Sequence, residues 1–258
     1  MKSQLWKSAL SPVIGISLLF AIWEIGVRVT NVSVFLLPPP SRIFQEIWTH
    51  GPMLMRHASS TLGIILAGFA LSAIVGIPLA LAVAFSPLFR RTVYPMLVFS
   101  QLVPKIALAP LFVIWLGFGF LPKVLIAFLL SFFAVVLQSV VGFTSIRPEQ
   151  VRVARSMGAK GATLFFKVRL PQALPNIFAG LKLAMASSAI GAIVGEFIAS
   201  QRGLGYLVLV ANGEMNTPLS FAGMLLLTLM GIVLYFAVEG VERLTTGWHV
   251  SQRLNPAL

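Results

Sequence analysis

The sequence contains neither cysteine nor aspartate, and it has only seven acidic residues. Without cysteine the chain has no disulfide, no thiol nucleophile and no thiolate metal site. The three histidines, His50, His57 and His249, are scattered along the chain. Catalysis by a carboxylate pair and metal binding therefore have almost no residues to use, and we expect neither a bound metal nor a cofactor. A Gly-x-x-x-x-Gly-Lys-Ser/Thr phosphate loop is also missing, so we do not expect this chain to hydrolyse ATP.

Charged residues of both signs are few: they make up 10% of the 258 residues, whereas a soluble domain carries about a quarter. Hydrophobic residues make up 58% and fall in long blocks, and a helix needs roughly 20 of them to cross the hydrocarbon core of a membrane. The pattern predicts an all-α integral membrane protein with about six spans, forming a single domain over residues 1–258. The predicted spans are Ala9–Val29, Ala58–Phe85, Val93–Leu116, Leu121–Phe143, Ala173–Ile198 and Leu219–Val241.

The net charge of +12 is distributed in short clusters between the apolar blocks. A nucleic-acid-binding face would gather these residues on one soluble surface, so we expect no nucleic-acid partner. Cytoplasmic loops of membrane proteins retain positive charge. If the N-terminus lies inside, twelve basic residues are cytoplasmic and five external, so the count predicts that both termini are cytoplasmic. We interpret the N-terminal apolar run as a retained span and not as a removed signal peptide.

Shorter features lie between the spans. Three prolines at residues 38–40 are expected to precede a short interfacial helix that carries Ile43, Phe44 and Trp48. Pro104 and Pro110 are expected to kink the third span. Residues 200–218 are expected to form a loop.

The longest basic segment, residues 145–171, has a pattern of its own. Pro148 and Glu149 suit the first turn of a helix, and Gly158 is a plausible C-terminal stop. A second short helix is expected over Ala162–Val168, exposing Leu164, Phe165 and Val168. Two short amphipathic helices in a cytoplasmic loop are suited to insertion into the groove of a partner; the alternative is a solvated connector.

This segment resembles the signature of the inner-membrane permeases of binding-protein-dependent ABC importers: Glu-Ala-Ala, three residues, Gly, nine residues, then Ile-x-Leu-Pro. Ala154, Gly158, Leu170 and Pro171 match it, and Val168 stands at the Ile position. The sequence departs from the signature at two positions, where Arg152 replaces the glutamate and Val153 the first alanine. The polar contact that this glutamate often makes with the ATPase therefore remains open. We place Arg155, which lies between the matching positions, in the same coupling loop.

Two further blocks resemble the nitrate, sulfonate and taurine permease group, which also includes pyrimidine-precursor permeases. They are residues 104–119, which include Pro-Lys-Ile-Ala-Leu-Ala-Pro-Leu, and Arg-Gly-Leu-Gly-Tyr at residues 202–206. The resemblance implies the architecture of type I importers in a bacterial inner membrane. It also implies a permease homodimer, cytoplasmic ATPase subunits that bind the ATP, and an external solute-binding protein. The solute would be small and either anionic or heterocyclic.

Polar side chains inside spans are candidates for the translocation path because they are costly there and usually functional. Lys105, predicted near the middle of the third span, would either meet an anionic solute or pair with a carboxylate. Glu196 is more easily explained as an anchor for the loop that follows it, and the serines by helix packing. The candidates are Gln101, Lys105, Gln138, Ser187, Ser188 and Glu196.

Other classes of membrane protein are less compatible with these features. A stand-alone secondary carrier or channel is the main alternative, and it would work without an ATPase. A membrane enzyme would need clustered His, Asp or Glu, and a scaffold would leave the spaced glycine and Leu-Pro frame unexplained. Co-purification of an ATPase subunit, lost on replacing residues 150–170, would distinguish these classes.

Overall fold

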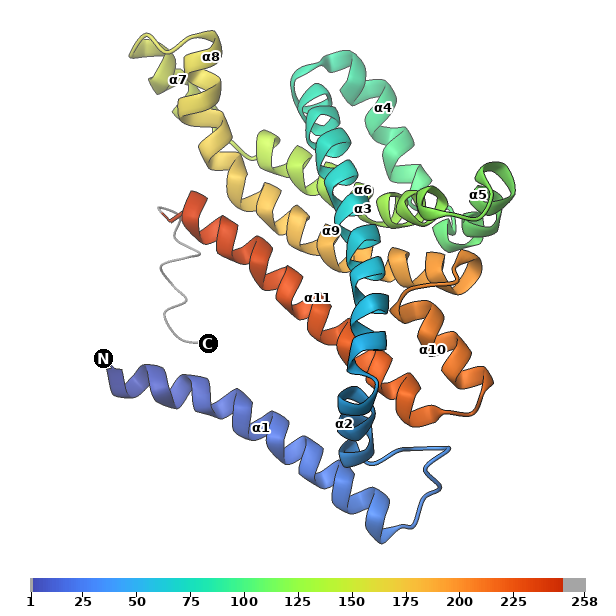
Figure 1. The fold of residues 1–258 in the computed structure, drawn as a ribbon. Helices are drawn as coiled ribbons and strands as arrows, with labels where there is room; N and C mark the ends of the chain where they lie inside the picture. The colour runs from blue at the N-terminus through green and yellow to red at the C-terminus, as the bar shows by residue number, and fades with distance from the viewer. Residues whose placement is uncertain (1, 248–258) are drawn as a thin grey trace.

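A computed structural model describes residues 2–247, with side chains described from Ile14 onward. This part of the chain is helical nearly throughout and contains no strand (Figure 1). The elements in chain order are α1 Lys2–Val29, α2 Pro40–Thr49, α3 Gly51–Phe85, α4 Pro87–Ser100, the 3₁₀ turn η1 Lys105–Leu108, α5 Ala109–Leu116, α6 Phe120–Thr144, α7 Pro148–Ser156, α8 Gly161–Leu164, the π-helical turn η2 Phe165–Arg169, α9 Leu170–Ala199, α10 Leu204–Gly213 and α11 Thr217–Thr245.

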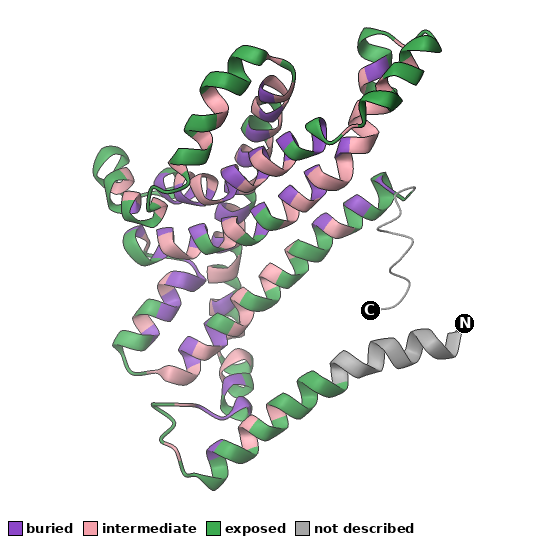
Figure 2. Ribbon diagram, turned by 180° about the vertical axis from the view of Figure 1, so that it is seen from behind, coloured by how far each residue is buried: buried purple, intermediate pink, exposed green. Residues whose placement is uncertain are grey.

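The centre of the fold is formed by α3, α6 and α9, which pack closely against one another. Small residues make this possible: a Cβ atom added to Gly191 of α9 would lie 2.6 Å from the Cα atom of Ala127 in α6, and Gly68 of α3 approaches the same residue. Close backbone approach at small residues is how membrane helices gain packing contacts, since lipid supplies little hydrophobic driving force between them. Buried residues accordingly concentrate in these central helices (Figure 2).

The remaining long helices lie outside this centre. An ion pair of 2.7 Å between Lys182 Nζ and Glu242 Oε2 joins α9 to α11. Helix α1 meets the rest of the fold mainly through α2 (Figure 1). Its described apolar side chains, such as Ile14, Leu18 and Ile22, are largely exposed, as expected for side chains that face lipid.

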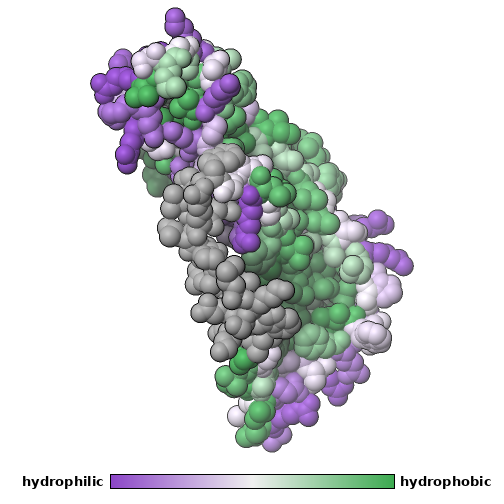
Figure 3. All heavy atoms as spheres, turned by 90° about the vertical axis from the view of Figure 1, so that its left-hand side faces the viewer, coloured by the Kyte–Doolittle hydropathy of each residue, from purple (hydrophilic) through white to green (hydrophobic). Residues whose placement is uncertain are grey.

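Four helices are long and apolar enough to span a membrane, namely α3, α6, α11 and the continuous run Gly161–Ala199. The bent pair α4 and α5 adds a fifth span if it is counted as one. The predicted spans Ala58–Phe85, Leu121–Phe143, Ala173–Ile198 and Leu219–Val241 are therefore confirmed. Helix α3, however, begins at Gly51 and not near Ala58. The first predicted span, Ala9–Val29, lies within α1, but its first side chains fall outside the described part. Figure 3 shows a hydrophobic band between hydrophilic ends.

The third predicted span, Val93–Leu116, is wrong as a single kinked helix. Helix α4 ends at Ser100, and the chain turns through 86° before it continues through η1 into α5. Pro104 lacks an amide proton, and proline disfavours the helical conformation at the residue before it, so a helix does not continue through this position. Pro110 lies in the first turn of α5, where proline is tolerated, so it produces no kink.

Three further expectations need correction. The second short helix expected at Ala162–Val168 is instead α8 and η2, which run without interruption into α9. Residues 200–218 are not only loop, because they contain α10. The short helix expected after the prolines is present as α2, but it begins at Pro40 itself, and it buries Ile43 while leaving Phe44 and Trp48 exposed.

Candidate functional site

The 145–171 segment projects from one end of the molecule, beyond α6 and α9 (Figure 1). Helix α7 begins at Pro148 and carries Glu149 in its first turn. It ends at Ser156, and Gly158, two residues later, has a φ of +86°. The Gly158 amide donates to the Arg155 carbonyl and the Ala159 amide to the Ala154 carbonyl, both at 3.0 Å. These two bonds define a Schellman motif, which needs a left-handed residue, so the predicted stop at Gly158 is confirmed.

The outer surface of α7 combines positive charge with exposed apolar side chains. Val153 is 59% exposed and Met157 82% exposed. Arg152, at the position of the missing glutamate, pairs with Glu149 at 2.9 Å, and both side chains are open to solvent. Arg155 is exposed as well, whereas Ala154 is half-buried. The main packing partner of α7 within this chain is α8, so most of its surface is free to bind another molecule.

The second half of the segment is anchored to the spans by aromatic rings. Phe165 lies 6.2 Å from Phe85 of α3 and 6.3 Å from Phe143 of α6, measured between ring centroids. Leu164 is buried, and Phe165 and Val168 are half-buried, which corrects the expectation that all three are exposed; Phe166 is the exposed residue instead. The segment is therefore an extension of α9. Its part around Phe165, which we call its root, packs against the spans, whereas α7, which we call its tip, is largely exposed.

A π-helical turn, η2, precedes Pro171. A proline ring clashes with the carbonyl four residues before it, and the wider π turn relieves such a clash. Val168, Leu170 and Pro171 are all half-buried at this junction. The signature residues Gly158 and Leu-Pro thus mark the two ends of the stretch that joins α7 to α9.

Lys105 and Gln101 lie at the break between α4 and α5, and the expectation that Lys105 sits in the middle of a helix is wrong. Lys105 Nζ donates to the Gln101 carbonyl at 3.3 Å and lies 4.7 Å from the ring centroid of Phe133 in α6. Gln101 is exposed. Non-helical backbone at membrane depth is tolerated where protein covers it or where it lines a water-filled cavity.

The other candidates lie between helices. Ser188 is buried, and its hydroxyl donates to the Ile65 carbonyl of α3 at 2.8 Å. This contact agrees with the interpretation that the serines serve helix packing. Ser187 is half-buried. Gln138 of α6 is half-buried and lies against Gly180 of α9. The structure thus separates the candidates into a group at the helix break and a group between the central helices.

Glu196 is fully buried at the opposite end of α9 from the 145–171 segment. Its Oε1 accepts from the Thr61 hydroxyl at 2.8 Å, and its Oε2 accepts from the Gly205 amide at 2.7 Å. The Thr61 oxygen in turn accepts from the Leu204 amide at 2.8 Å. Two amides at the start of α10, which have no carbonyl partner within the helix, are thereby satisfied. This is the loop-anchoring arrangement that the sequence favoured for Glu196.

The glycines of the 202–206 block allow this approach. Gly203 has a φ of +120°, and a Cβ atom there would overlap the Glu196 carboxyl group. A Cβ atom on Gly205 would lie 2.9 Å from Glu196 Oε2. The Gly203 amide is also 3.1 Å from Nδ1 of His57. We name the set formed by Glu196, Thr61, His57 and residues 203–205 the Glu196 cluster.

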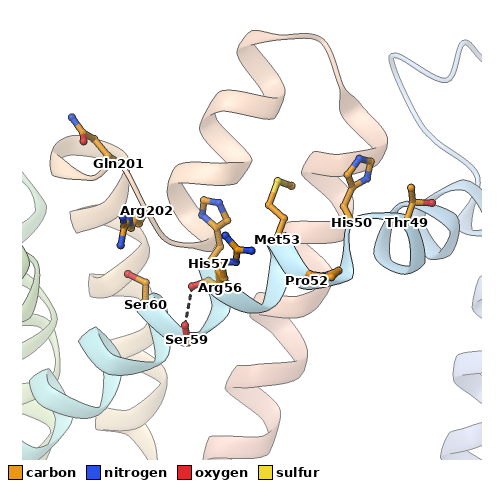
Figure 4. Close-up of a pocket in the computed structure, with 10 residues that line it drawn as sticks. All are labelled: Thr49, His50, Pro52, Met53, Arg56, His57, Ser59, Ser60, Gln201 and Arg202. Atoms are coloured by element: carbon orange, nitrogen blue, oxygen red, sulfur yellow. Dashed lines mark hydrogen bonds between the residues drawn. The ribbon is translucent and has the colours of Figure 1, made fainter.

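A groove of about 870 Å³ opens beside the Glu196 cluster (Figure 4). Arg56 and His57 from the first turns of α3 and Arg202 from the loop after α9 line it, together with hydroxyl groups such as that of Ser60. Neither arginine takes part in an ion pair among the described residues. The groove is therefore positively charged and rich in hydrogen-bond donors.

Sequence reasoning missed three residues of this end: Thr61, His57 and Lys123. Lys123 is 8% exposed, and its Nζ donates to Ser200 Oγ at 2.9 Å. Thr61 and His57 lie one helical turn apart on α3 and face α10. Their four-residue spacing was the only available signal, and it does not reveal a partner more than a hundred residues away.

Comparison with known proteins gives a consistent result. Residues 62–246 match the family described as the binding-protein-dependent transport system inner membrane component. The chain is 35% identical to the formylaminopyrimidine transport permease protein ThiX of Halalkalibacterium halodurans, covering 95% of this chain and 98% of that one. It is 34% identical to the riboflavin transport system permease protein RibX of Chloroflexus aurantiacus, covering 94% and 91%. The taurine transport system permease protein TauC of Escherichia coli is 29% identical, covering 95% and 93%.

Among solved structures, an inward-facing structure of the MetNI methionine ABC transporter shares the fold. The TM-score is 0.65 at 19% sequence identity, with 77% of this chain and 98% of that chain covered. The likeness supports the all-helical architecture of type I importer permeases for this chain.

Proposed function

The chain belongs to the family of binding-protein-dependent transport system inner membrane components and is a permease of an ABC importer for a small solute; from this premise we propose how its parts divide the work. The observation that carries the proposal is the projecting 145–171 segment, which has a fixed root at Phe165 and an exposed tip at α7. A transport subunit that is driven by another protein needs such a surface, because it has no nucleotide-binding loop of its own.

We propose that α7 is the helix that docks into a cytoplasmic ATPase subunit, which binds the ATP. Val153 and Met157 supply apolar contacts and Arg155 supplies charge. Gly158 and the Leu170-Pro171 junction transmit the motion of the ATPase into α9. Arg152 is engaged with Glu149, so the charge that the family signature places at this position is reversed here, and the docking contact relies on the other residues.

The opposite end, with the Glu196 cluster and the cationic groove, is proposed to face outward and to receive the solute-binding protein. This orientation agrees with the excess of basic residues at the other end. Both termini are then cytoplasmic. The absence of cysteine makes the orientation simple to test, since Ser156→Cys and Met215→Cys each introduce a single exposed thiol. A membrane-impermeant maleimide should label only Met215→Cys from outside; labelling of Ser156→Cys from outside would contradict the orientation.

The translocation path is proposed to run along the break between α4 and α5, at the contact between two copies of the chain. Leu102, Ile106, Ile114 and Trp115 are more than half exposed around this break, and non-helical backbone there requires cover or a cavity. Lys105, adjacent to Gln101, provides a positive charge for an anionic or polar heterocyclic solute. Gln138, Ser187, Ser188 and Glu196 position the helices around the path.

The solute class follows from the relatives and not from the groove itself. The relatives carry names for formylaminopyrimidine, riboflavin and taurine transport, which are small, polar and either ring-containing or anionic compounds. We propose a solute of this class for the present chain. Selectivity would reside largely in the external binding protein, whose ligand can be identified by direct binding measurements.

The decisive experiment measures ATP hydrolysis and uptake separately in the assembled transporter. Arg155→Glu and Gly158→Trp should leave hydrolysis in place and reduce uptake strongly, because the 145–171 segment no longer transmits the change. Arg243→Gln, which removes a basic residue elsewhere, is the matched control. Unchanged uptake by both variants at normal membrane levels would contradict the coupling role, and uptake without any ATPase would favour a stand-alone carrier.

A further inference from the structure

Four arginines gather around Phe85, the last residue of α3, at the end of the molecule from which the 145–171 segment projects. A cavity of about 300 Å³ is lined by Phe85, Arg155 and Arg169. A second cavity of about 250 Å³ is lined by Phe85, Arg90 and Arg91. Phe85 lines both cavities, and we name the two adjacent cationic cavities together the Phe85 recess.

Among the described residues, none of these arginines forms an ion pair. The described residues form five ion pairs, and none of the pairs includes Arg90, Arg91, Arg155 or Arg169. The only acidic residue of the 145–171 segment, Glu149, is held by Arg152. Four guanidinium groups around one recess repel one another unless an anion lies between them.

Arg169 provides a more specific indication. Its guanidinium carbon lies 4.7 Å from the centroid of the Phe85 ring, and its buried Nε has no hydrogen-bond partner among the described residues. A buried donor without an acceptor costs free energy, and an anionic oxygen in the recess would supply the missing acceptor. Arg90, by contrast, already donates to the Ala84 carbonyl at 2.8 Å, which holds its side chain at the edge of the recess.

The surroundings of the recess distinguish a lipid from a soluble anion. Helix α3 is apolar up to Phe85, where it ends. On α4, Leu88 is 66% exposed and Phe89 is 36% exposed directly beside the arginines. A phosphate bound by the arginines with acyl chains against Leu88 and Phe89 satisfies both kinds of surface, whereas a soluble anion leaves the apolar side chains uncovered. Basic pockets between membrane helices on the cytoplasmic side are suited to anionic lipid headgroups.

We propose that the Phe85 recess binds the phosphate headgroup of an anionic phospholipid in the cytoplasmic leaflet. The lipid would lie between the end of α3 and the root of the 145–171 segment, and would steady the segment whose tip contacts the ATPase. The leaflet assignment rests on the proposed orientation, but binding of the lipid does not, so the two can fail independently.

The test is native mass spectrometry of the purified full chain, titrated with phosphatidylglycerol or with phosphatidylcholine of the same acyl composition. The wild type should bind phosphatidylglycerol preferentially. Arg90→Gln combined with Arg169→Gln should weaken that binding about 30-fold, since each basic side chain near an anionic surface contributes a factor of about five. Arg243→Gln, which removes one arginine outside the recess, should bind like the wild type.

Each alternative has a distinct outcome. Equal binding of the two lipids by the wild type, or equal phosphatidylglycerol binding by the wild type and the double variant, would overturn the proposal. Displacement of the lipid by inorganic phosphate at similar concentration would indicate a site for soluble anions. Loss of the lipid when the ATPase subunit is added would show that the arginines serve the protein partner instead. Arg90→Lys combined with Arg169→Lys retains the charge and should bind the lipid, which separates lost binding from misfolding; a well-folded lysine variant without binding would count against the electrostatic basis.

Discussion

The two ends of α9 are constructed in opposite ways. At the Glu196 end, a fully buried carboxyl group bonds to α3 and to the start of α10. At the other end, α9 continues through a π-helical turn into a segment whose tip has few contacts with the rest of the chain. The first arrangement fixes α3, α9 and α10 relative to one another. The second leaves α7 largely exposed and available to a partner. The comparison indicates which end of α9 is fixed to its neighbours and which end leaves a surface free to bind a partner.

The largest effect on stability is expected at Glu196. Glu196→Ala should lower the free energy of unfolding by about 3 kcal/mol, because the buried Gly205 amide loses its acceptor and the Thr61 hydroxyl loses one of its partners. Thermal unfolding of the purified protein in detergent measures this. Glu214→Ala, a change of the same kind at an exposed position, should have little effect, and Glu196→Gln should recover part of the loss. Equal stabilities of Glu196→Ala and Glu214→Ala would remove the basis for calling this end rigid.

A pair of glycine substitutions compares the two ends directly. Gly203→Ala should cost about 2 kcal/mol or more, because its φ of +120° is unfavourable for alanine and the new methyl group overlaps Glu196. Gly158→Ala should cost only about 1 kcal/mol, since its φ of +86° is unfavourable but nothing lies within 4 Å of the added methyl group. Unfolding temperatures of the two variants give the order, and the reverse order would show that the turn at Gly158 is the more constrained one.

A smaller effect is expected between the central helices. Ser188→Ala removes the bond to the Ile65 carbonyl and should cost about 0.6 kcal/mol, an average value for hydrogen bonds between membrane helices. Ser187→Ala is the matched control on the same helix and should be closer to neutral. If Ser187→Ala instead impaired uptake while Ser188→Ala did not, Ser187 would belong to the solute path, whereas unchanged uptake in both would restrict the serines to packing.

The smallest effect on stability, but a large effect on assembly, is expected at the tip of the 145–171 segment. Met157→Asp places a charge on an exposed apolar surface and should change the free energy of unfolding by less than about 0.5 kcal/mol. It should nevertheless reduce co-purification of the ATPase subunit. Met215→Asp is the matched control, since Met215 is similarly exposed at the other end. Retention of the ATPase by Met157→Asp would mean that the tip is not the docking surface.

Local patterns were sufficient for most of the helices and for the end of α7. Apolar blocks located the spans of α3, α6, α9 and α11 because a membrane requires about 20 consecutive apolar residues. Gly158 was recognised as a helix stop because only a residue that tolerates positive φ suits that turn. The break at Pro104 was only half-predicted, since proline indicates a disturbance of the helix but does not determine whether it is a kink or a turn of 86°.

The sequence by itself determined that this chain is a polytopic helical membrane protein with a projecting basic segment, because hydropathy and turn chemistry act over short distances along the chain. Only the tertiary structure decided which polar residues meet. Glu196 reaches Thr61 across 135 positions of sequence, and Arg169 reaches Phe85 across 84 positions. Such contacts depend on how α3, α6 and α9 pack, and packing at small residues leaves no periodic trace that identifies the partner.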